Sequence, residues 1–488
     1  MGIDASKQRL STVYFVGIKG TGVCALAELM HNAGVKVSGS DIAEVFYTDA
    51  ILKELNIPYY NDFDPSRITN DIDMVIHSAA YSADTNCELE QAQKINIPVL
   101  KYTDALGDWS ARFESCGVCG VHGKTTTTAI AGILARAAGI PAQILTGSAA
   151  IDFGSRSTLI LGNKYFIAET CEYRKHFLSF RPKYIVLTSV ESDHQDFFPD
   201  YESIRGAFVE YCRLLPAGGK LIYCADDNGA SDVASIIESE DRGIELIPYG
   251  FTAPGGWKVL SYNVEKERAV FNIAKIPGEI KLRIPGRHEA LNTAAALALI
   301  ASLARADNSG IFSEEKIQSI KTALENFRST KRRSEILGER QGIIFMDDYG
   351  HHPTAIKTTL AGIKSFYPER RLIVSFMSHT YTRTSALLDE FAASFADADI
   401  LFLHKIYASA RENYKGGVNG RTLFERTAAL RGGKDIFYVE EYDDAVKPLC
   451  EILKPGDIFI TLGAGNNWPL GEKLFNHFKS IDNTGETS

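Results

Sequence analysis

The sequence predicts an α/β protein of three domains, each built around a largely parallel sheet. Its 488 residues exceed the size at which a single hydrophobic core stops growing. Short apolar runs that read as strands alternate with helix-like stretches along the chain, as in parallel sheets covered by helices. The composition, 45% hydrophobic and 23% charged, is that of a globular protein. We expect domains at residues 1–110, 111–328 and 329–488.

Charge and hydropathy exclude several classes of protein. The net charge is −9 and the one compact basic cluster is Lys331-Arg332-Arg333, so the sequence indicates no nucleic-acid partner. Residues 1–12 lack the apolar core of a signal peptide, and the most apolar helical stretch, 290–306, suits a buried helix better than a membrane span. We therefore expect a cytoplasmic protein that does not enter a membrane, as a monomer or homodimer, with its eight cysteines as free thiols.

The first domain opens with a βαβ pattern typical of a Rossmann-like fold. An apolar strand over 13–18 leads through Gly17, Gly20 and Gly22 into a helix, and a second strand ends at Asp41. The glycine spacing is GxxGxG rather than the GxGxxG of the dinucleotide fingerprint, and Lys19 lies within the loop. Either NAD or another nucleotide diphosphate would suit this helix N-terminus.

The second domain carries the most informative motif, GVHGKTTTT at residues 120–128. A Gly-Lys-Thr run between an apolar strand and a helix cradles nucleotide phosphates with backbone N–H groups. Lys124 would reach the β- and γ-phosphates, and the Thr125 hydroxyl would bind Mg²⁺. The glycine expected five residues before Gly123 is replaced by Val118, so the loop belongs to a subtype. The sequence predicts a P-loop ATPase-like domain.

Acidic residues and a histidine follow two further strands of this domain. Glu169 ends one strand, and Glu191, Asp193, His194 and Asp196 follow another. Ligands of open α/β sheets lie beyond the carboxyl ends of the strands, so these side chains are candidate Mg²⁺ ligands. Residues 247–284 alternate in polarity and predict antiparallel strands.

The third domain is a second Rossmann-like unit, which follows a polar hinge at residues 327–330. Apolar strands at 343–346, 372–376, 400–403 and 458–462 each end in a polar turn. The turns that begin at Asp347, Ser378, Ala408 and Gly463 carry histidine, arginine, glycine or asparagine. They predict a second ligand-binding edge.

Seven motifs together identify a family resemblance that covers essentially the whole chain. They are GVHGKTTTT (120–128), AETCE (168–172), TSVESDHQD (188–196), GRHEALNTAAA (286–296), TKRRSE (330–335), DDYGHHPT (347–354) and GAGNNW (463–468). In the order and approximate spacing of these motifs, the sequence resembles the Mur ligases, the ATP-dependent amide-forming enzymes of peptidoglycan precursor synthesis. GIKGTG (17–22), SGSD (38–41) and SHTYTRT (378–384) resemble the member that joins L-alanine to UDP-N-acetylmuramate. The related ligase of a recycled tripeptide lacks the HTYTRT element.

The resemblance implies a role for each matching residue. ATP contacts fall at Gly120, Gly123, Lys124, Thr125, Thr126, His288, Asn292, Arg332 and Asp348. Contacts with the UDP-sugar fall at Gly17, Gly20, Thr21, Gly22, Ser40, Asp41, His77 and Ser78. The amino acid would lie among Tyr349, His351, His379 and Arg383, with Arg383 on its carboxylate. Thr125, Glu169 and His194 would bind Mg²⁺, and the catalytic set would be Lys124, His194, His351 and His379.

The implied reaction forms an acyl phosphate from ATP and the lactyl carboxylate of the nucleotide sugar, and the L-alanine amine then displaces phosphate. His351 and His379 are the candidate bases. The sequence departs from the family pattern at Val121, Ser189, Glu289, Thr380 and Asn466. Glycine, serine or a tripeptide as acceptor, an NAD-dependent oxidoreductase and a regulatory nucleotide-binding protein remain alternatives.

Overall fold

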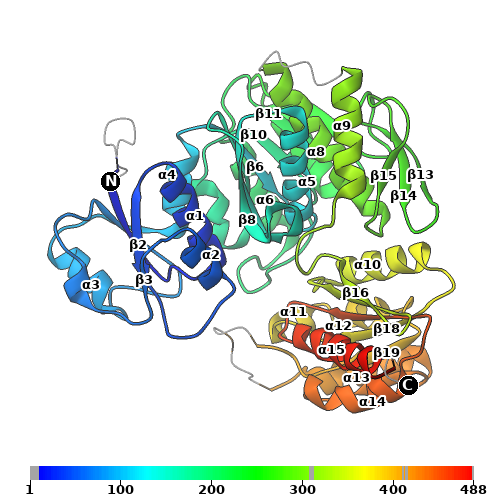
Figure 1. The fold of residues 1–488 in the computed structure, drawn as a ribbon. Coiled ribbons are helices and arrows are strands. Elements are labelled where there is room, and N and C mark those ends of the chain that lie inside the picture. Colours follow the sequence, from blue (N-terminus) through cyan, green and yellow to red (C-terminus); the bar gives the residue numbers. More distant parts are fainter. Residues whose placement is uncertain (1–9, 307–312, 409–411, 413–415, 486–488) are drawn as a thin grey trace. The chain divides into compact units, whose positions relative to one another are not determined.

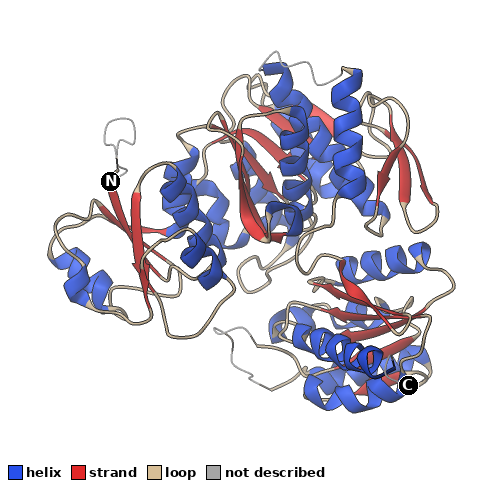
Figure 2. Cartoon of the chain, in the orientation of Figure 1, coloured by secondary structure: helices blue, strands red, loops and turns tan. Residues whose placement is uncertain are grey.

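The computed structural model describes residues 10–306, 313–408, 412 and 416–485, in which helices and strands alternate (Figures 1 and 2). The chain divides into two compact units. The first comprises Met1–Val190, Arg205–Pro254 and Ala295–Ile320, and the second comprises Glu191–Ile204, Gly255–Ala294 and Lys321–Ser488. The predicted α/β class is confirmed, because the large sheets are mainly parallel. The domain boundaries at residues 110 and 328 stay predictions.

The N-terminal sheet of the first unit has the strand order β3-β2-β1-β4-β5, and its neighbouring strands run parallel. The strands are β1 (Thr12–Val16), β2 (Lys36–Ser40), β3 (Tyr59–Tyr60), β4 (Met74–His77) and β5 (Val99–Lys101). The helices are α1 (Thr21–Asn32), α2 (Thr48–Glu54), α3 (Cys87–Lys94) and α4 (Tyr102–Ser110). In β1, Val13, Phe15 and Val16 are fully buried, as in a parallel strand covered on both faces. The strand order reverses between β1 and β4, which is where such sheets bind ligands.

The central sheet of the first unit has the order β12-β11-β10-β6-β9-β7-β8. Its strands are β6 (Glu114–Cys119), β7 (Ala142–Ala150), β8 (Arg156–Ile160), β9 (Tyr165–Glu169), β10 (Pro182–Leu187), β11 (Lys220–Cys224) and β12 (Glu245–Tyr249). Its helices include α5 (Lys124–Ala138), α6 (Tyr201–Cys212), α7 (Asn228–Ser239), α8 (Arg287–Ala306) and α9 (Glu314–Asn326), and α6, α8 and α9 contribute residues to both units. β6 lies between β10 and β9 and parallel to both. The ends of these three strands therefore meet at one edge of the sheet.

The prediction of antiparallel strands over 247–284 is only partly right. Strand β12 pairs in parallel with β11 at the edge of the central sheet. Antiparallel pairing is confined to β13 (Val259–Val264), β14 (Ala269–Ile273) and β15 (Ile280–Leu282), which form a small sheet of their own. An edge strand is only partly buried, so its polarity pattern resembles that of an antiparallel strand.

The C-terminal sheet of the second unit has the order β16-β17-β21-β18-β19-β20, and β16 runs antiparallel to β17. Its strands are β16 (Glu335–Arg340), β17 (Ile343–Asp348), β18 (Arg371–Phe376), β19 (Ile400–Leu403), β20 (Ile436–Tyr438) and β21 (Asp457–Leu462). Its helices are α10 (Pro353–Phe366), α11 (Tyr381–Ala386), α12 (Leu388–Ala393), α13 (Gly420–Arg431), α14 (Val446–Ile452) and α15 (Trp468–Gly485). Phe345, Phe459 and Phe478 belong to one buried cluster on this sheet. The core fixes the strand ends that carry the predicted turns.

A buried ion pair joins the N-terminal and central sheets within the first unit. Glu28 on α1 is 4% exposed and pairs with Arg156 on β8. Thr158 donates a 2.6 Å hydrogen bond from Oγ1 to the second oxygen of Glu28, and Arg156 also lies 2.6 Å from the exposed Glu54. Because the Glu28 carboxylate is shielded from water, this contact is stronger than an exposed ion pair.

We predict that Glu28→Ala destabilises the first unit by about 3 kcal/mol, because it leaves the Arg156 charge without its buried partner. Glu54→Ala removes the other partner of the same arginine. Its carboxylate is 69% exposed, so the expected cost is below about 1 kcal/mol. The urea midpoints of both variants, followed by circular dichroism, measure the difference. Equal shifts for the two variants would contradict the assignment of Glu28 as the stabilising partner.

Candidate functional site

The phosphate loop lies between the end of β6 and the start of α5. Gly120 has φ 131°, and a Cβ there would lie 2.1 Å from Thr188 Oγ1. Gly123 is in the left-handed region at φ 78° and caps α5. Both positions therefore require glycine. The N–H of His122 donates a 2.9 Å hydrogen bond to Ser189 Oγ. Ser189, where the sequence departs from the family pattern, therefore holds the loop from the end of β10.

Lys124 is the first residue of α5, and its ammonium group is fully engaged in this structure. It donates to Gly120 O at 2.5 Å and to Val121 O at 3.3 Å. It also lies 3.2 and 3.1 Å from the two carboxylate oxygens of Glu172. Burial alone would lower the pKa of Lys124, but Glu172 and the neighbouring acidic groups raise the pKa above its usual range. The predicted phosphate-binding lysine is therefore fully charged.

Thr125 and Glu169, two of the predicted Mg²⁺ ligands, lie in contact. The Thr125 hydroxyl donates a 2.7 Å hydrogen bond to Glu169 Oε2, and the Gly147 N–H donates to the same oxygen at 2.8 Å. A hydroxyl beside a carboxylate is a donor set that suits Mg²⁺ next to phosphate oxygens. The third predicted ligand, His194, belongs to the second unit.

The glycine-rich turn after β1 meets the end of β2. The N–H groups of Gly17 and Ile18 donate to Ser40 O at 2.8 and 3.1 Å. Asp41 Oδ2 accepts from the Lys19 N–H at 2.8 Å, and its Oδ1 accepts from the Tyr81 hydroxyl at 3.1 Å. The Asp41 carboxylate, predicted to contact the UDP-sugar, thus already accepts hydrogen bonds from within the fold.

Lys19 has a structural position rather than the phosphate-facing one that its place in the loop suggests. The side chain is 1% exposed, and its ammonium donates to Ile42 O and Glu44 O, both at 2.9 Å. It also lies 3.4 Å from Asp49. Lys19 therefore anchors the segment after β2.

The other residues predicted to contact the UDP-sugar lie at the ends of β1, β2 and β4 in the first unit. The Ser40 side chain is fully buried and donates to Glu88. His77 Nδ1 lies 2.9 Å from Ser78 O. Gly20 precedes α1, which begins at Thr21, and a Cβ on Gly22 would lie 2.7 Å from the Tyr102 hydroxyl. Their roles in ligand binding stay predictions.

In the second unit, Arg383 forms a buried ion pair with Asp193. The Nε of Arg383 lies 2.8 Å from Asp193 Oδ1, and the two side chains are 6% and 4% exposed. Arg383 Nη1 also donates to His379 O at 3.3 Å. His194, in the left-handed region at φ 54°, has its ring 3.9 Å from Asp193. Asp193 therefore contacts Arg383 in this structure, although the sequence predicted it only as a possible metal ligand.

His351 and His379 lie on neighbouring turns with their ring centroids 6.5 Å apart. The ring centroid of His351 lies 5.2 Å from that of Tyr349, and His351 Nδ1 donates a 3.0 Å hydrogen bond to Tyr349 O. Burial and the Arg383 charge lower the pKa of His351 well below its usual range and lower the pKa of His379 to about 4. Both imidazoles are therefore neutral at pH 7. The predicted amino-acid set Tyr349, His351, His379 and Arg383 does come together.

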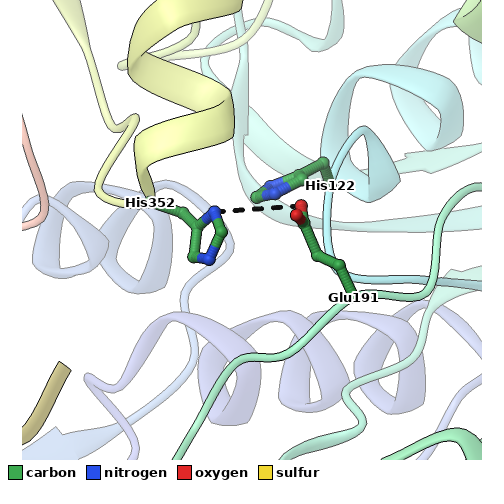
Figure 3. Close-up of side chains that lie close together, drawn as sticks. All are labelled: His122, Glu191 and His352. Carbon is green, nitrogen blue, oxygen red and sulfur yellow. Dashed lines mark ion pairs between the residues drawn. The ribbon is translucent and has the colours of Figure 1, made fainter. Parts of the chain in front are cut away.

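The segment after β10 also contacts the start of α10. Glu191 Oε1 lies 3.8 Å from His352 Nδ1, as the dashed line in Figure 3 marks, and Thr354 donates a 2.9 Å hydrogen bond to Glu191 Oε2. His352 caps α10, whose first residue is Pro353. The third side chain in Figure 3, His122, belongs to the phosphate loop of the first unit.

His288, Glu289 and Asn292 form a second polar group at the start of α8. Glu289 is 4% exposed, and its carboxylate lies 3.2 Å from His288 Nε2 and 3.1 Å from Asn292 Nδ2. Glu289, one of the departures from the family pattern, thus links the two predicted nucleotide contacts. Burial alone would lower the pKa of His288, but the charge and hydrogen bond of Glu289 outweigh burial and raise that pKa.

Arg332 and Asp348, also predicted to contact ATP, are held by hydrogen bonds within the second unit. Arg332 Nε lies 3.0 Å from Asp347 Oδ2, and its Nη2 donates to Gly463 O at 2.7 Å. Asp348 accepts from the N–H of Ser334 and from that of Gly350, both at 2.7 Å. Their predicted contacts with ATP are untested.

The fold and the loop define the class of an α/β nucleotide-binding enzyme. The model of the Mur ligase family catalytic domain matches residues 12–114, that of the Mur ligase middle domain matches 118–300, and that of the Mur ligase glutamate ligase domain matches 332–465. The chain belongs to the Mur ligase family.

Curated relatives and solved structures agree with this membership. The chain is 49% identical to a protein of Treponema pallidum named UDP-N-acetylmuramate--L-alanine ligase over 96% of each chain. It is 38% identical to a Borrelia garinii protein of the same name, over 95% of this chain and 98% of that protein. A UDP-N-acetylmuramate-alanine ligase of Thermotoga maritima shares the fold with a TM-score of 0.76 and 23% identity, over 96% and 99% of the two chains. A murein peptide ligase of Psychrobacter arcticus gives a TM-score of 0.64 at 21% identity, over 96% and 98%.

We predict that Gly147→Ala weakens Mg²⁺-dependent ATP binding by about tenfold or more, because positions that orient a metal ligand typically have effects of this size. A Cβ at residue 147 would lie 2.4 Å from Glu169 Oε2 and would displace that carboxylate. Gly206→Ala is the matched control, because nothing lies within 4 Å of a Cβ there. Calorimetric titration with ATP at several Mg²⁺ concentrations measures the effect, and equal affinities in both variants would contradict it.

We predict that the His379 ring stays neutral as the pH falls from about 8 to 5, whereas an unfolded histidine gains its proton near pH 6.5. The reason is that burial and Arg383 lower the pKa of His379 to about 4. Ring nitrogen shifts of ¹⁵N-histidine-labelled protein, assigned with His379→Gln, measure the titration. The same signals in urea provide the control. A folded-state midpoint between about pH 6 and 7 would show that the ring is solvated.

Proposed function

We propose that this protein joins L-alanine to the lactyl carboxylate of UDP-N-acetylmuramate and converts ATP to ADP and phosphate in doing so. The observation that carries the proposal is 49% identity, over 96% of each chain, to a protein named for that reaction. Family membership and the phosphate loop support the use of ATP. The nucleotide substrates support a cytoplasmic location.

ATP is needed because a carboxylate is a poor electrophile in water. The lactyl carboxylate attacks the γ-phosphorus, the bond to the β-phosphate oxygen breaks, and ADP leaves an acyl phosphate behind. Lys124 offers a fixed positive charge to the transferring phosphoryl group. The N–H groups of the loop and the N-terminus of α5 add further positive potential there.

Thr125 and Glu169 would hold Mg²⁺, and their 2.7 Å contact supports this pairing. When bound, Mg²⁺ would offset the negative charge of the phosphate oxygens. His194 is the further ligand that the family resemblance proposes. Gly147 keeps Glu169 in place through its N–H group.

The amino acid would bind in the second unit, where Arg383 supplies the cation for its carboxylate. Nε of Arg383 donates to Asp193 Oδ1 and Nη1 donates to His379 O, so an amino-acid carboxylate would share the guanidinium group with these two acceptors. The neutral amine attacks the acyl carbon, and phosphate departs from the tetrahedral intermediate. His351 and His379 are neutral and can accept the proton that the amine releases.

We predict that phosphate release from ATP, Mg²⁺ and UDP-N-acetylmuramate is strongly stimulated by L-alanine, because the acyl phosphate turns over only when an amine attacks it. A coupled phosphate assay measures the rate, and mass spectrometry identifies the amide. Lys124→Ala should lower the rate by about a hundredfold or more, as expected for the loss of a charge on the transferring group. Lys183→Ala is the control, because Lys183 pairs with Glu114 at the opposite end of β6.

Each other result of the phosphate-release assay would favour a different function. Stimulation only by the tripeptide would assign the protein as the recycling ligase, and stimulation by glycine or serine would change the amino acid. Slow ATP hydrolysis that no acceptor stimulates would indicate a regulatory nucleotide-binding protein. Binding of NAD(H) without ATP turnover would support an oxidoreductase.

A further inference from the structure

Glu172 lies against the phosphate-loop lysine but has no role in the reaction as described. Its side chain is 2% exposed, and its two carboxylate oxygens lie 3.2 and 3.1 Å from Lys124 Nζ. Lys124 is itself only 14% exposed. Glu169, three residues earlier, contacts Thr125 instead. The two glutamates of the AETCE motif therefore meet two different side chains of the phosphate loop.

The backbone after Glu172 is held in an uncommon conformation. Arg174 and Lys175 both lie in the left-handed region, at φ 52° and 57°. The Lys175 N–H donates to Glu172 O at 2.8 Å, which closes a tight turn. Phe177, two residues after this turn, stacks on Tyr211 with a ring centroid separation of 4.4 Å. Two consecutive non-glycine residues in this region are costly, and such strain persists where the surrounding structure fixes the segment.

We propose that Glu172 is a positioning residue that holds Lys124 in the nucleotide-free protein and competes with the nucleotide phosphates for its ammonium group. The proposal rests on the proposed function in one respect, that ATP binds at this loop. Its consequence is weaker nucleotide binding than the loop alone would give. Release of ADP after each turnover is thereby made easier.

Charge and burial support the competition. A phosphate oxygen that reaches Lys124 must share the ammonium group with a carboxylate that is already in contact with it. Glu172 is removed from water, so solvent screens its repulsion of the incoming phosphate only weakly. The two carbonyl contacts of Lys124, to Gly120 and Val121, carry no net charge and do not compete in this way.

The test is ADP binding by calorimetry in EDTA, where no metal contributes, for the wild type, Glu172→Gln and Glu172→Asp. Glutamine has nearly the same shape as glutamate but no charge, so Glu172→Gln should bind ADP about tenfold more tightly, the size of one charge-assisted hydrogen bond. Aspartate keeps the charge at a greater distance and should give an intermediate affinity. Glu114→Gln is the matched control, because Glu114, at the start of β6, pairs with Lys183 of β10 at 2.8 Å, and its ADP affinity should equal that of the wild type.

Kinetics of the ligase reaction provide a second readout. Glu172→Gln should lower the KM for ATP without raising kcat, because tighter ADP binding slows product release. If Glu172 had a purely structural role, the Glu172→Gln substitution would instead raise the KM for ATP and lower kcat together. If Glu172→Gln binds ADP no more tightly than the wild type, or does so only when Mg²⁺ is present, the proposal is wrong. ADP binding requires no amide formation, so a wild type that L-alanine fails to stimulate would overturn the proposed function and leave this test intact.

Discussion

The position of the phosphate loop depends on three parallel strands that end side by side. β6 lies between β10 and β9, so the loop that follows β6 has a strand end on either side. Glu169 ends β9 and contacts Thr125, while Ser189 follows β10 and accepts from His122. A parallel sheet places these groups together without any long-range side-chain recognition. The two flanking strand ends thus hold the loop in place, which is the preorganisation that phosphoryl transfer requires.

Both units keep the cations that we expect to bind substrates in contact with buried carboxylates. Lys124 lies against Glu172, and Arg383 lies against Asp193. An uncompensated buried charge is costly, so a folded protein without its substrates needs such partners. The same partners reduce the net attraction for an anionic substrate. On the proposed binding roles, the affinity for a phosphate or carboxylate would depend on how that group shares the cation with the resident carboxylate, and not on the cation alone.

The sequence predicts those features that a local backbone pattern determines. The strands, the phosphate loop and the contact of Thr125 with Glu169 follow from apolar runs, glycines and the ends of parallel strands. Lys19 shows the limit, because a lysine in a glycine-rich loop can turn either toward a ligand or into the fold, and here it binds Ile42 O and Glu44 O. Glu172 and Asp193 were visible in the AETCE and TSVESDHQD motifs, yet their partners depend on side-chain directions in the folded state. The polarity pattern predicts antiparallel pairing for β12, but this strand pairs in parallel with β11, because a half-exposed edge strand has the same polarity pattern.

The environment of the two histidines bears on how the amine of the proposed substrate loses its proton. An imidazole with a pKa of about 4, as at His379, is a weak base for an ammonium group. Yet the burial and the Arg383 charge that lower this pKa act on any cation bound beside them, including the ammonium of an amino acid. They favour the neutral, nucleophilic amine, whereas Asp193 partly offsets the arginine. The site would thus promote attack chiefly by making the protonated amine less stable, with His351 and His379 as acceptors of a proton that is already weakly held.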